Sequence, residues 1–153
     1  MDLVMQKATE LGAAAITALS CERSTVRLDE ERASKRLEHW RNVVISAAEQ
    51  SGRVRLPHVS GPLPLAEACK LDAGLRLVLD PSAGAALTQV VTENSAEAGI
   101  ALVVGPEGGL AGQELALLRD AGWESVALGP RTLRTETAGM AALAAIQAAK
   151  GLL

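Results

Sequence analysis

Apolar positions along this chain follow two different periods. Short apolar runs of four to six residues predict buried strands, and longer stretches with helical spacing of apolar residues predict helices. The predicted strands are residues 14–19, 56–59, 75–79, 100–104 and 125–128. The predicted helices are residues 2–12, 32–50, 65–70, 86–98, 112–121 and 135–152. This alternation indicates one α/β domain with a parallel sheet and helices on both faces.

Glycine and proline mark the boundaries between these elements. Gly12 and Gly52 follow apolar-periodic stretches and predict the ends of the first two helices. Residues 57–64 hold three prolines and a glycine, so we expect a connector there, with one short strand at its start. Residues 21–32 are polar and charged and are predicted to form a loop. The chain begins directly in a helix, and we therefore expect that an upstream domain is missing.

The composition narrows the classes of function. Of 153 residues 48% are hydrophobic, yet Phe and Tyr are absent and Trp occurs twice. This excludes the aromatic stacking platform of many single-strand RNA binders, and we expect Trp40 and Trp123 in the core or an interface. The net charge of −3 excludes a general polyanion binder. RNA binding would therefore need a local patch, a second subunit or a further domain.

The cysteines and the lengths of the apolar runs indicate where in the cell the protein is expected. Cys21 and Cys69 lie 48 positions apart without a CxxC motif, so we expect two free thiols and no metal site. No apolar run approaches the ~18 residues of a membrane span, and no signal-peptide pattern opens the chain. We expect a cytoplasmic protein with no membrane partner, and His39 and His58 at its surface.

Two glycine-containing loops are the strongest functional signal. Residues 103–110 read Val-Val-Gly-Pro-Glu-Gly-Gly-Leu, and residues 128–137 read Leu-Gly-Pro-Arg-Thr-Leu-Arg-Thr-Glu-Thr. Each follows a predicted strand and leads into a helix, where α/β sheets bind ligands through free backbone N–H groups. The first loop matches neither the P-loop nor the G-x-G-x-x-G pattern, and an ordinary strand-to-helix turn is the alternative for it. The second loop holds two arginines and a carboxylate, which indicates a catalytic site.

Together the two loops closely resemble the SPOUT class of S-adenosylmethionine-dependent RNA methyltransferases. Within that class they are similar to the family that methylates N3 of a uridine in bacterial 16S ribosomal RNA. Residues 6–12, 22–24 and 48–53 also resemble motifs of that family, in the same order. The resemblance implies a carboxyl-terminal trefoil knot that holds S-adenosylmethionine without a metal, and a homodimer with its RNA site between subunits. The family normally carries an N-terminal PUA-like RNA-binding domain, which we expect to be missing here.

The resemblance assigns cofactor contacts to both loops and to the strand before them. Aliphatic side chains and backbone groups would hold the adenine, and glycines would allow close approach of the backbone. Core packing is the alternative for the leucines and helix capping the safer expectation for Thr135, whereas Glu107 either shapes its loop or contacts the ribose. The cofactor-binding candidates are Leu79, Gly105, Pro106, Glu107, Gly108, Gly109, Leu128, Gly129, Leu133 and Thr135.

Catalysis at uridine N3 requires loss of its proton, which leaves negative charge on the base. Arg131 or Arg134 could stabilise this anion through a uridine carbonyl oxygen, and the alternatives are a surface salt bridge or an RNA phosphate contact. Glu136 could accept the proton, but a carboxylate in the first turn of a helix also stabilises the helix dipole.

The RNA-binding candidates are the arginines Arg53 and Arg55, with Arg23 and Arg27 as an extension of the patch. Residues 21–55 hold eight basic and six acidic side chains, so a solvated mixed-charge face is the alternative.

The last helix is rich in alanine around its whole circumference, with Met140 among its few larger apolar residues. We expect it to be deeply buried or to form a subunit interface. Two other functions remain open: a SPOUT methyltransferase that modifies a ribose 2′-hydroxyl or guanine N1, and a non-catalytic dimerisation or RNA-docking module.

Overall fold

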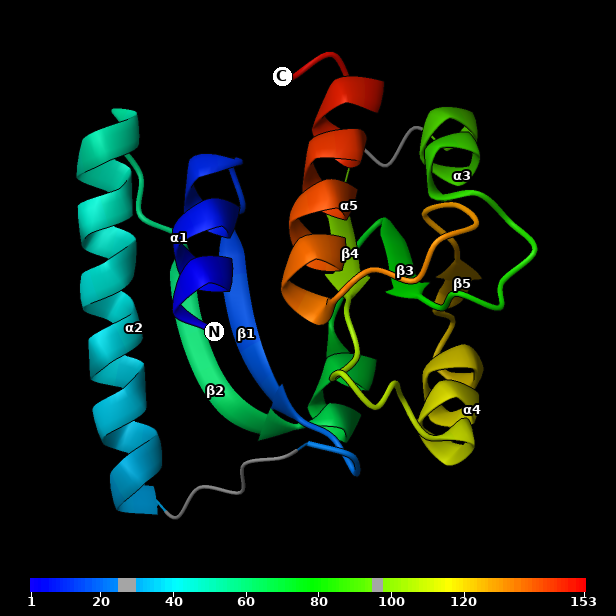
Figure 1. Ribbon diagram of the computed structural model, residues 1–153, viewed down its shortest axis with the longest axis horizontal. Coiled ribbons are helices and arrows are strands. Elements are labelled where there is room, and N and C mark those ends of the chain that lie inside the picture. Colours follow the sequence, from blue (N-terminus) through cyan, green and yellow to red (C-terminus); the bar gives the residue numbers. More distant parts are fainter. Residues whose placement is uncertain (25–29, 95–97) are drawn as a thin grey trace.

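The computed structural model describes residues 1–24, 30–94 and 98–153 (Figure 1). Its elements are, in chain order, α1 (Asp2–Glu10), β1 (Ala15–Ser20), α2 (Glu30–Ser51), β2 (His58–Pro64), the 3-10 helix η1 (Leu65–Lys70), β3 (Leu75–Leu79), α3 (Leu87–Glu93), β4 (Ile100–Val103), α4 (Gly112–Asp120), β5 (Glu124–Val126) and α5 (Thr135–Ala149).

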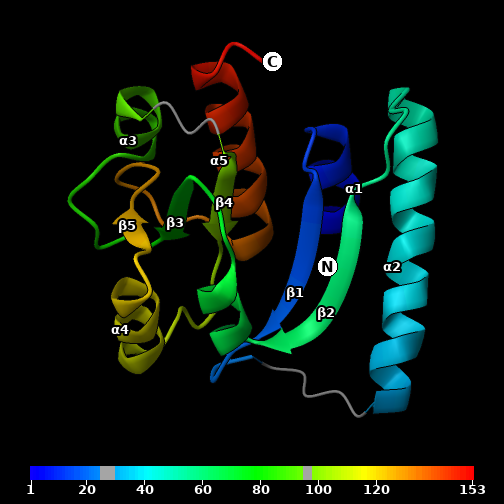
Figure 2. The ribbon, with the colours of Figure 1, turned by 180° about the vertical axis from the view of Figure 1, so that it is seen from behind.

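All strand pairs in the described part of the chain are parallel, as the alternation of elements predicts. The strands form two sheets, one of β1 and β2 and one in the order β4-β3-β5. In Figures 1 and 2 the two sheets lie side by side with α2 at one outer edge of the molecule. The α/β class with parallel pairing is confirmed, and its division into two sheets was not visible in the sequence.

Strand β2 differs most from the sequence prediction. The stretch expected to be a connector with a short strand at 56–59 is instead a strand that runs from His58 to Pro64 and pairs with β1. Prolines are tolerated because β2 has a ladder partner on one side only, so a missing N–H leaves no bond unmade. Gly61 has φ +93°, and a Cβ there would lie 2.2 Å from the carbonyl oxygen of Ala18. Only glycine allows this approach of the two strands.

Other boundaries differ by a few residues. Helix α2 begins at Glu30, two residues before the predicted start, and α3 ends at Glu93, well before the predicted residue 98. Part of that predicted helix (95–97) and part of the predicted loop (25–29, with Arg27) lie outside the described residues. The ends of α1 and α2 at Gly12 and Gly52 are confirmed, and both glycines have positive φ.

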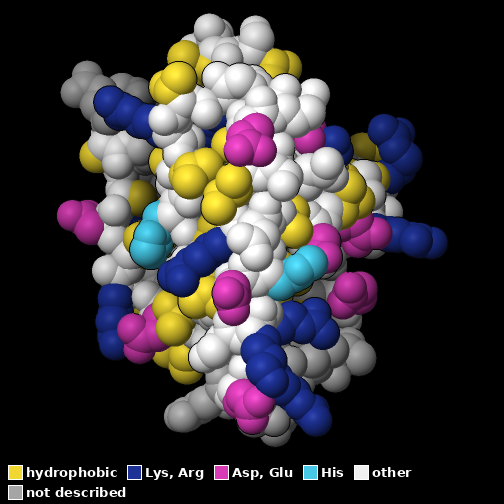
Figure 3. All heavy atoms as spheres, turned by 90° about the vertical axis from the view of Figure 1, so that its left-hand side faces the viewer, with side chains coloured by type: hydrophobic (Ala, Val, Ile, Leu, Met, Phe, Trp, Pro, Cys, Tyr) yellow, Lys and Arg dark blue, Asp and Glu magenta, His cyan; other side chains and the backbone are white. Residues whose placement is uncertain are grey.

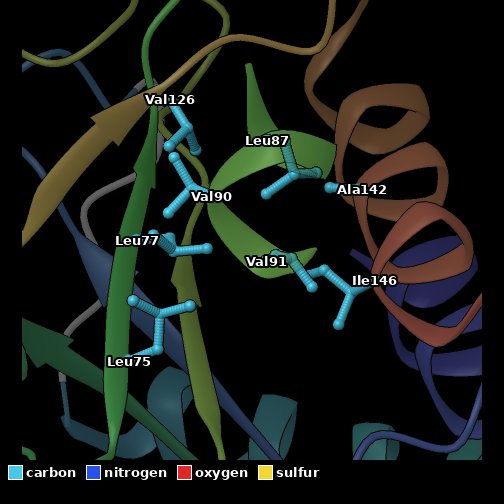
Figure 4. Close-up of a cluster of buried hydrophobic side chains, with 8 residues drawn as sticks. All are labelled: Leu75, Leu77, Leu87, Val90, Val91, Val126, Ala142 and Ile146. Carbon is cyan, nitrogen blue, oxygen red and sulfur yellow. The ribbon is translucent and has the colours of Figure 1, made fainter. Parts of the chain in front are cut away.

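Hydrophobic residues on both faces of β3 account for the packing of helices on each side. Leu75 and Leu77 point toward α3 and α5 (Figure 4), where they meet the apolar side chains of those helices. Val78 packs on the opposite face in a cluster with Leu118 of α4 and with Trp123. Helices therefore cover both faces of the β4-β3-β5 sheet, as predicted.

A separate cluster joins α1 and α2 to the β1-β2 sheet. Trp40 is 3% exposed in this cluster, and Trp123 is 4% exposed in its own. The placement of both tryptophans in the core is confirmed.

Helix α5 lies between the two halves of the molecule and contacts both α1 and α3 (Figures 1 and 2). The Gln147 side chain donates a hydrogen bond to the carbonyl oxygen of Leu11 at 2.9 Å. Only Ala142 and Ile146 of α5 are fully buried, and Met140 is half-buried. The alanine-rich surface is thus only partly covered within one chain.

Candidate functional site

Three chain segments leave the β4-β3-β5 sheet at the same edge, because parallel strands end on the same side. Val78 pairs with Val103, and Leu79 pairs with Val126, so the ends of the three strands are adjacent. The segment after β3 is tied to the segment after β5 by hydrogen bonds from Asp80 N–H to the Val126 carbonyl and from Leu87 N–H to the Ala127 carbonyl. The two glycine-containing loops and the end of β3 therefore share one end of the sheet.

The first loop, residues 105–110, is a tight turn that we call the glycine loop. Gly109 N–H donates to the Pro106 carbonyl at 2.8 Å, and Gly109 has φ +70°. A Cβ on Gly105 would lie 3.0 Å from Leu110 Cγ and 3.2 Å from its backbone nitrogen. Gly105 thus lets the loop fold back on itself. Glu107, Gly108 and Gly109 are exposed, which leaves their backbone open to a ligand.

The second loop brings half-buried apolar side chains and exposed cations to the same edge. Leu79 and Leu128 are half-buried and pack against the cluster under α3 and α5. Gly129 has φ +139°, with open space where a Cβ would stand, and Leu133 is half-buried. Arg131 and Arg134 are exposed.

The start of α5 corrects the expectation for Thr135. Arg134 occupies the N-cap position with φ −62° and ψ 151°, and no side chain caps the helix. Thr135 already has a helical conformation, so its hydroxyl does not take the capping role that was expected. Glu136 is half-buried in the first turn. Within the described residues, the side chains of Arg131, Arg134 and Glu136 make no hydrogen bond or ion pair.

The turn after β1 contacts the glycine loop, which the sequence analysis did not anticipate. Arg23 Nη1 donates to the Gly108 carbonyl oxygen at 2.9 Å. The Glu114 carboxylate accepts the N–H groups of Glu22 and Ala111, each at 2.8 Å. A Glu at the third position of a predicted helix is a capping-box signal that could have pointed to Glu114.

Cys21 lies in the same turn, and its environment disfavours the ionised thiolate form. Burial raises the pKa of the Cys21 thiol, the negative charge of Glu114 raises it further, and the Ser24 hydroxyl lowers it. Both Cys21 and Cys69 are free, as predicted.

The other predicted RNA contacts are distributed differently. Arg53 Nη1 donates to the carbonyl oxygens of Thr9 at 2.8 Å and Ala13 at 2.9 Å, and so links the end of α1 to the turn before β1. Arg55 is exposed. His39 and His58 are at the surface, as expected, and His39 bonds to Asp2 at 2.7 Å. Figure 3 shows basic and acidic side chains mixed over the face at the α2 side of the molecule.

A shallow groove of about 460 Å³ between α1 and α2 lies apart from these loops, and no predicted site residue lines it. Across the part of the chain that the structure describes, no group of three or more His, Cys, Asp or Glu side chains could hold a metal ion. None of the described helices is both long and apolar enough to cross a membrane.

Known proteins with this sequence pattern and fold identify the family. A family model described as an RNA methyltransferase domain matches residues 1–147. The ribosomal RNA small subunit methyltransferase E of Mycobacterium bovis is 42% identical, over 95% of this chain and 57% of that protein. The Bacillus subtilis protein of the same name is 35% identical, over 95% of this chain and 60% of its own length.

A solved structure gives the same result for the fold. The Neisseria gonorrhoeae ribosomal RNA small subunit methyltransferase E, bound to S-adenosyl methionine, superimposes with a TM-score of 0.88 at 40% identity, covering 97% of this chain and 60% of that one. The chain thus spans about three fifths of the length of these relatives. The trefoil knot stays a prediction. Because the family model matches nearly the whole sequence, this chain belongs to the RNA methyltransferase domain family.

Proposed function

We propose that this domain binds S-adenosylmethionine at the edge formed by the ends of β3, β4 and β5, and methylates uridine N3 in 16S ribosomal RNA. The observation that carries the proposal is the meeting of the glycine loop, the 128–135 loop and Leu79 at one end of the sheet. The relative from Neisseria gonorrhoeae, with the same fold, is bound to S-adenosyl methionine, which supports this choice of ligand.

The residues at this edge fit the proposed cofactor. Half-buried Leu79, Leu128 and Leu133 offer apolar surface to an adenine, since no Phe or Tyr is present. Exposed backbone in the glycine loop and at Gly129 offers hydrogen-bonding groups to the ribose and the amino-acid tail. The Pro106 carbonyl oxygen accepts the Gly109 N–H within that loop, Glu107 would either shape the loop or contact the ribose, and Thr135 is the last cofactor-binding candidate. The bound cofactor would supply a methyl group already activated by its sulfonium, without a metal.

The chain's own part in the chemistry is to favour the deprotonated base. Arg131 and Arg134 are exposed and have no side-chain partner among the described residues, so both guanidinium groups are available to a substrate. An arginine that donates to a uridine carbonyl oxygen stabilises the anion and lowers the pKa of N3. Glu136 lies in the first turn of α5, two residues after Arg134, and would accept the proton.

RNA binding and assembly are further parts of the proposal. Arg55 and Arg23 are exposed and would contact RNA phosphates, whereas Arg53 is held by two backbone carbonyl oxygens.

A homodimer through α5 would cover its half-buried alanine-rich surface around Met140. A cytoplasmic location follows from the proposed substrate. Light scattering at micromolar concentration tests the dimer, which a monomer would refute.

The decisive experiment is methylation of small-subunit RNA or particles with this chain, followed by mass spectrometry of the modified base. We expect cofactor binding by calorimetry and a methyl group on uridine N3. A methyl group on a ribose or on guanine N1 would contradict the proposed target. Failure to bind S-adenosylmethionine would favour a non-catalytic module of the same fold.

A further inference from the structure

The turn after β1 supports the glycine loop from outside the sheet edge. Arg23 donates from Nη1 to the Gly108 carbonyl oxygen at 2.9 Å, although the two residues lie 85 positions apart. Its stem also packs there, since Arg23 Cβ lies 3.3 Å from where a Cβ on Gly108 would be. Arg23 therefore contacts the middle of the loop with both a polar and an apolar part of its side chain.

Glu114 holds this turn in place. It is half-buried in the first turn of α4, and each of its carboxylate oxygens accepts one backbone N–H. One N–H belongs to Ala111, directly after the glycine loop, and the other to Glu22, directly before Arg23. Hydrogen bonds to an ionised carboxylate are roughly twice as strong as neutral ones. The loop is thus tied at Gly108 and again at Ala111.

Contacts inside the loop fix its two ends better than its middle: the Gly109 N–H donates to the Pro106 carbonyl oxygen and Leu110 is buried, whereas residues 107–109 are exposed. Its exposed residues include two glycines, which have the greatest backbone freedom of any residue type. A loop that is already held in its bound conformation loses less entropy when a ligand binds. External contacts can therefore strengthen binding without touching the ligand.

We propose that Arg23 and Glu114 are positioning residues that hold the glycine loop ready for the cofactor, so that cofactor affinity depends on side chains outside the cofactor site. This inference rests on the proposed function, because it takes the glycine loop as part of the S-adenosylmethionine site. It gives Arg23 a role separate from any RNA contact.

The test compares charge-matched variants of the 153-residue chain by calorimetry with S-adenosylmethionine and by thermal unfolding without it. Arg23→Ala should weaken cofactor binding about tenfold while the unfolding midpoint stays close to that of the wild type. Arg23→Lys keeps a donor and should recover part of the affinity. Arg41→Ala, which removes an exposed cation from α2, is the control and should bind as the wild type does. Wild-type affinity in Arg23→Ala would overturn the proposal.

A second variant removes the other support. Glu114→Gln replaces one of the two acceptor oxygens by an NH2 group that cannot accept an N–H, removes the negative charge, and should also weaken cofactor binding. Gln113→Ala, which changes an exposed residue of the same first turn, is its control. If only the unfolding midpoint falls and the affinity is kept, Glu114 merely caps α4 and the inference is wrong for it.

Failure of the proposed function can be told apart from failure of this inference. If the wild type does not bind S-adenosylmethionine, the proposed function is wrong, and amide hydrogen exchange then decides the positioning role. Faster exchange at Gly108 to Leu110 in Arg23→Ala and Glu114→Gln would support the role, and unchanged exchange would overturn it.

Discussion

The two halves of this domain use their charged side chains in different ways. In the amino-terminal half (residues 1–24 and 30–74), several charged side chains form ion pairs with each other, as in Lys7 with Glu10 at 2.8 Å and Lys35 with Glu31 at 2.6 Å. In the carboxyl-terminal half, no ion pair forms within residues 75–94 and 98–153, the part that the structure describes. Arg131 and Arg134 make no side-chain hydrogen bond or ion pair within these residues, and for that reason we propose that they act on a substrate.

The comparison separates two kinds of motif residue. Thr9 and Arg53 belong to segments that resemble family motifs, yet both are engaged in the architecture. Thr9 is fully buried and donates its hydroxyl to the Met5 carbonyl, and Arg53 donates to the Thr9 carbonyl. A residue in a family motif can therefore stabilise the fold or belong to the candidate site, and the contacts in the structure distinguish the two roles.

Loss of an arginine from the 128–135 loop should have the largest effect. Arg134→Ala or Arg131→Ala should lower the single-turnover methylation rate by a few hundredfold, about 3–4 kcal/mol, because charge on the base grows in the transition state. Arg134→Lys should recover only part of the rate, since the directed fork is lost. The assay uses saturating small ribosomal particles and cofactor. Full rates in both alanine variants would remove the arginines from the chemical step.

Loss of Arg53 should act on stability instead. Arg53→Ala removes two hydrogen bonds to backbone carbonyl oxygens and should lower the free energy of unfolding by about 2 kcal/mol. For a domain of this size the thermal midpoint should fall by roughly 4–8 °C. Arg55→Ala is the matched control, because Arg55 is exposed and neighbouring in sequence. An unchanged thermal midpoint in Arg53→Ala would show that Arg53 does not stabilise the fold, and the proposed contrast with Arg131 and Arg134 would be wrong.

The boundary between the halves can be monitored at Cys21. Burial and the charge of Glu114 both raise the pKa of its thiol, so Glu114→Gln should lower that pKa toward its ordinary value. More thiolate at a given pH means faster alkylation, and the midpoint of the rate–pH curve should move to lower pH. The measurement is made in a Cys69→Ser background, with Gln113→Ala as control. If the midpoint of the rate–pH curve stays the same or rises in Glu114→Gln, the proposed effect of the Glu114 charge on Cys21 is wrong.

The smallest effect is expected at the exposed pair of Asp2 and His39. The hydrogen bond from His39 lowers the pKa of the Asp2 carboxyl below its ordinary 3.8. A lowered folded-state pKa means that the stabilisation is present above the ordinary value and is lost as the pH falls through the lowered one. Asp2→Asn should therefore cost less than about 0.5 kcal/mol at neutral pH and nothing in strong acid, as measured by urea unfolding. A larger loss would show that this pair is not merely a surface contact.

Sequence reasoning was most successful where apolar runs are long or turns are glycine-marked. The run at Leu75–Leu79 gave β3 with its observed bounds, and Gly12 and Gly52 ended their helices as predicted. The prolines of β2 suggested a connector, because a proline removes a ladder donor and the sequence does not reveal that the strand has one pairing side only.

The site shows the same limit. The two loops were predicted from local patterns, because each glycine and proline constrains the backbone of the turn in which it lies. The link from Glu22 to Glu114 was missed because it joins residues 92 positions apart, and no local pattern carries a contact of that range. Thr135 was misjudged as a cap because the helix begins one residue earlier than its hydroxyl would require.

A backbone-amide NMR titration of this chain with S-adenosylmethionine tests the central claim most directly. We predict that the largest shifts fall at Leu79, in the glycine loop and in residues 128–135, with smaller shifts at Arg23 through its bond to Gly108. The groove between α1 and α2, including Gln6 and Asn42, should be unaffected. Shifts confined to that groove, or no saturable shifts at all, would contradict the placement of the cofactor at the ends of β3, β4 and β5.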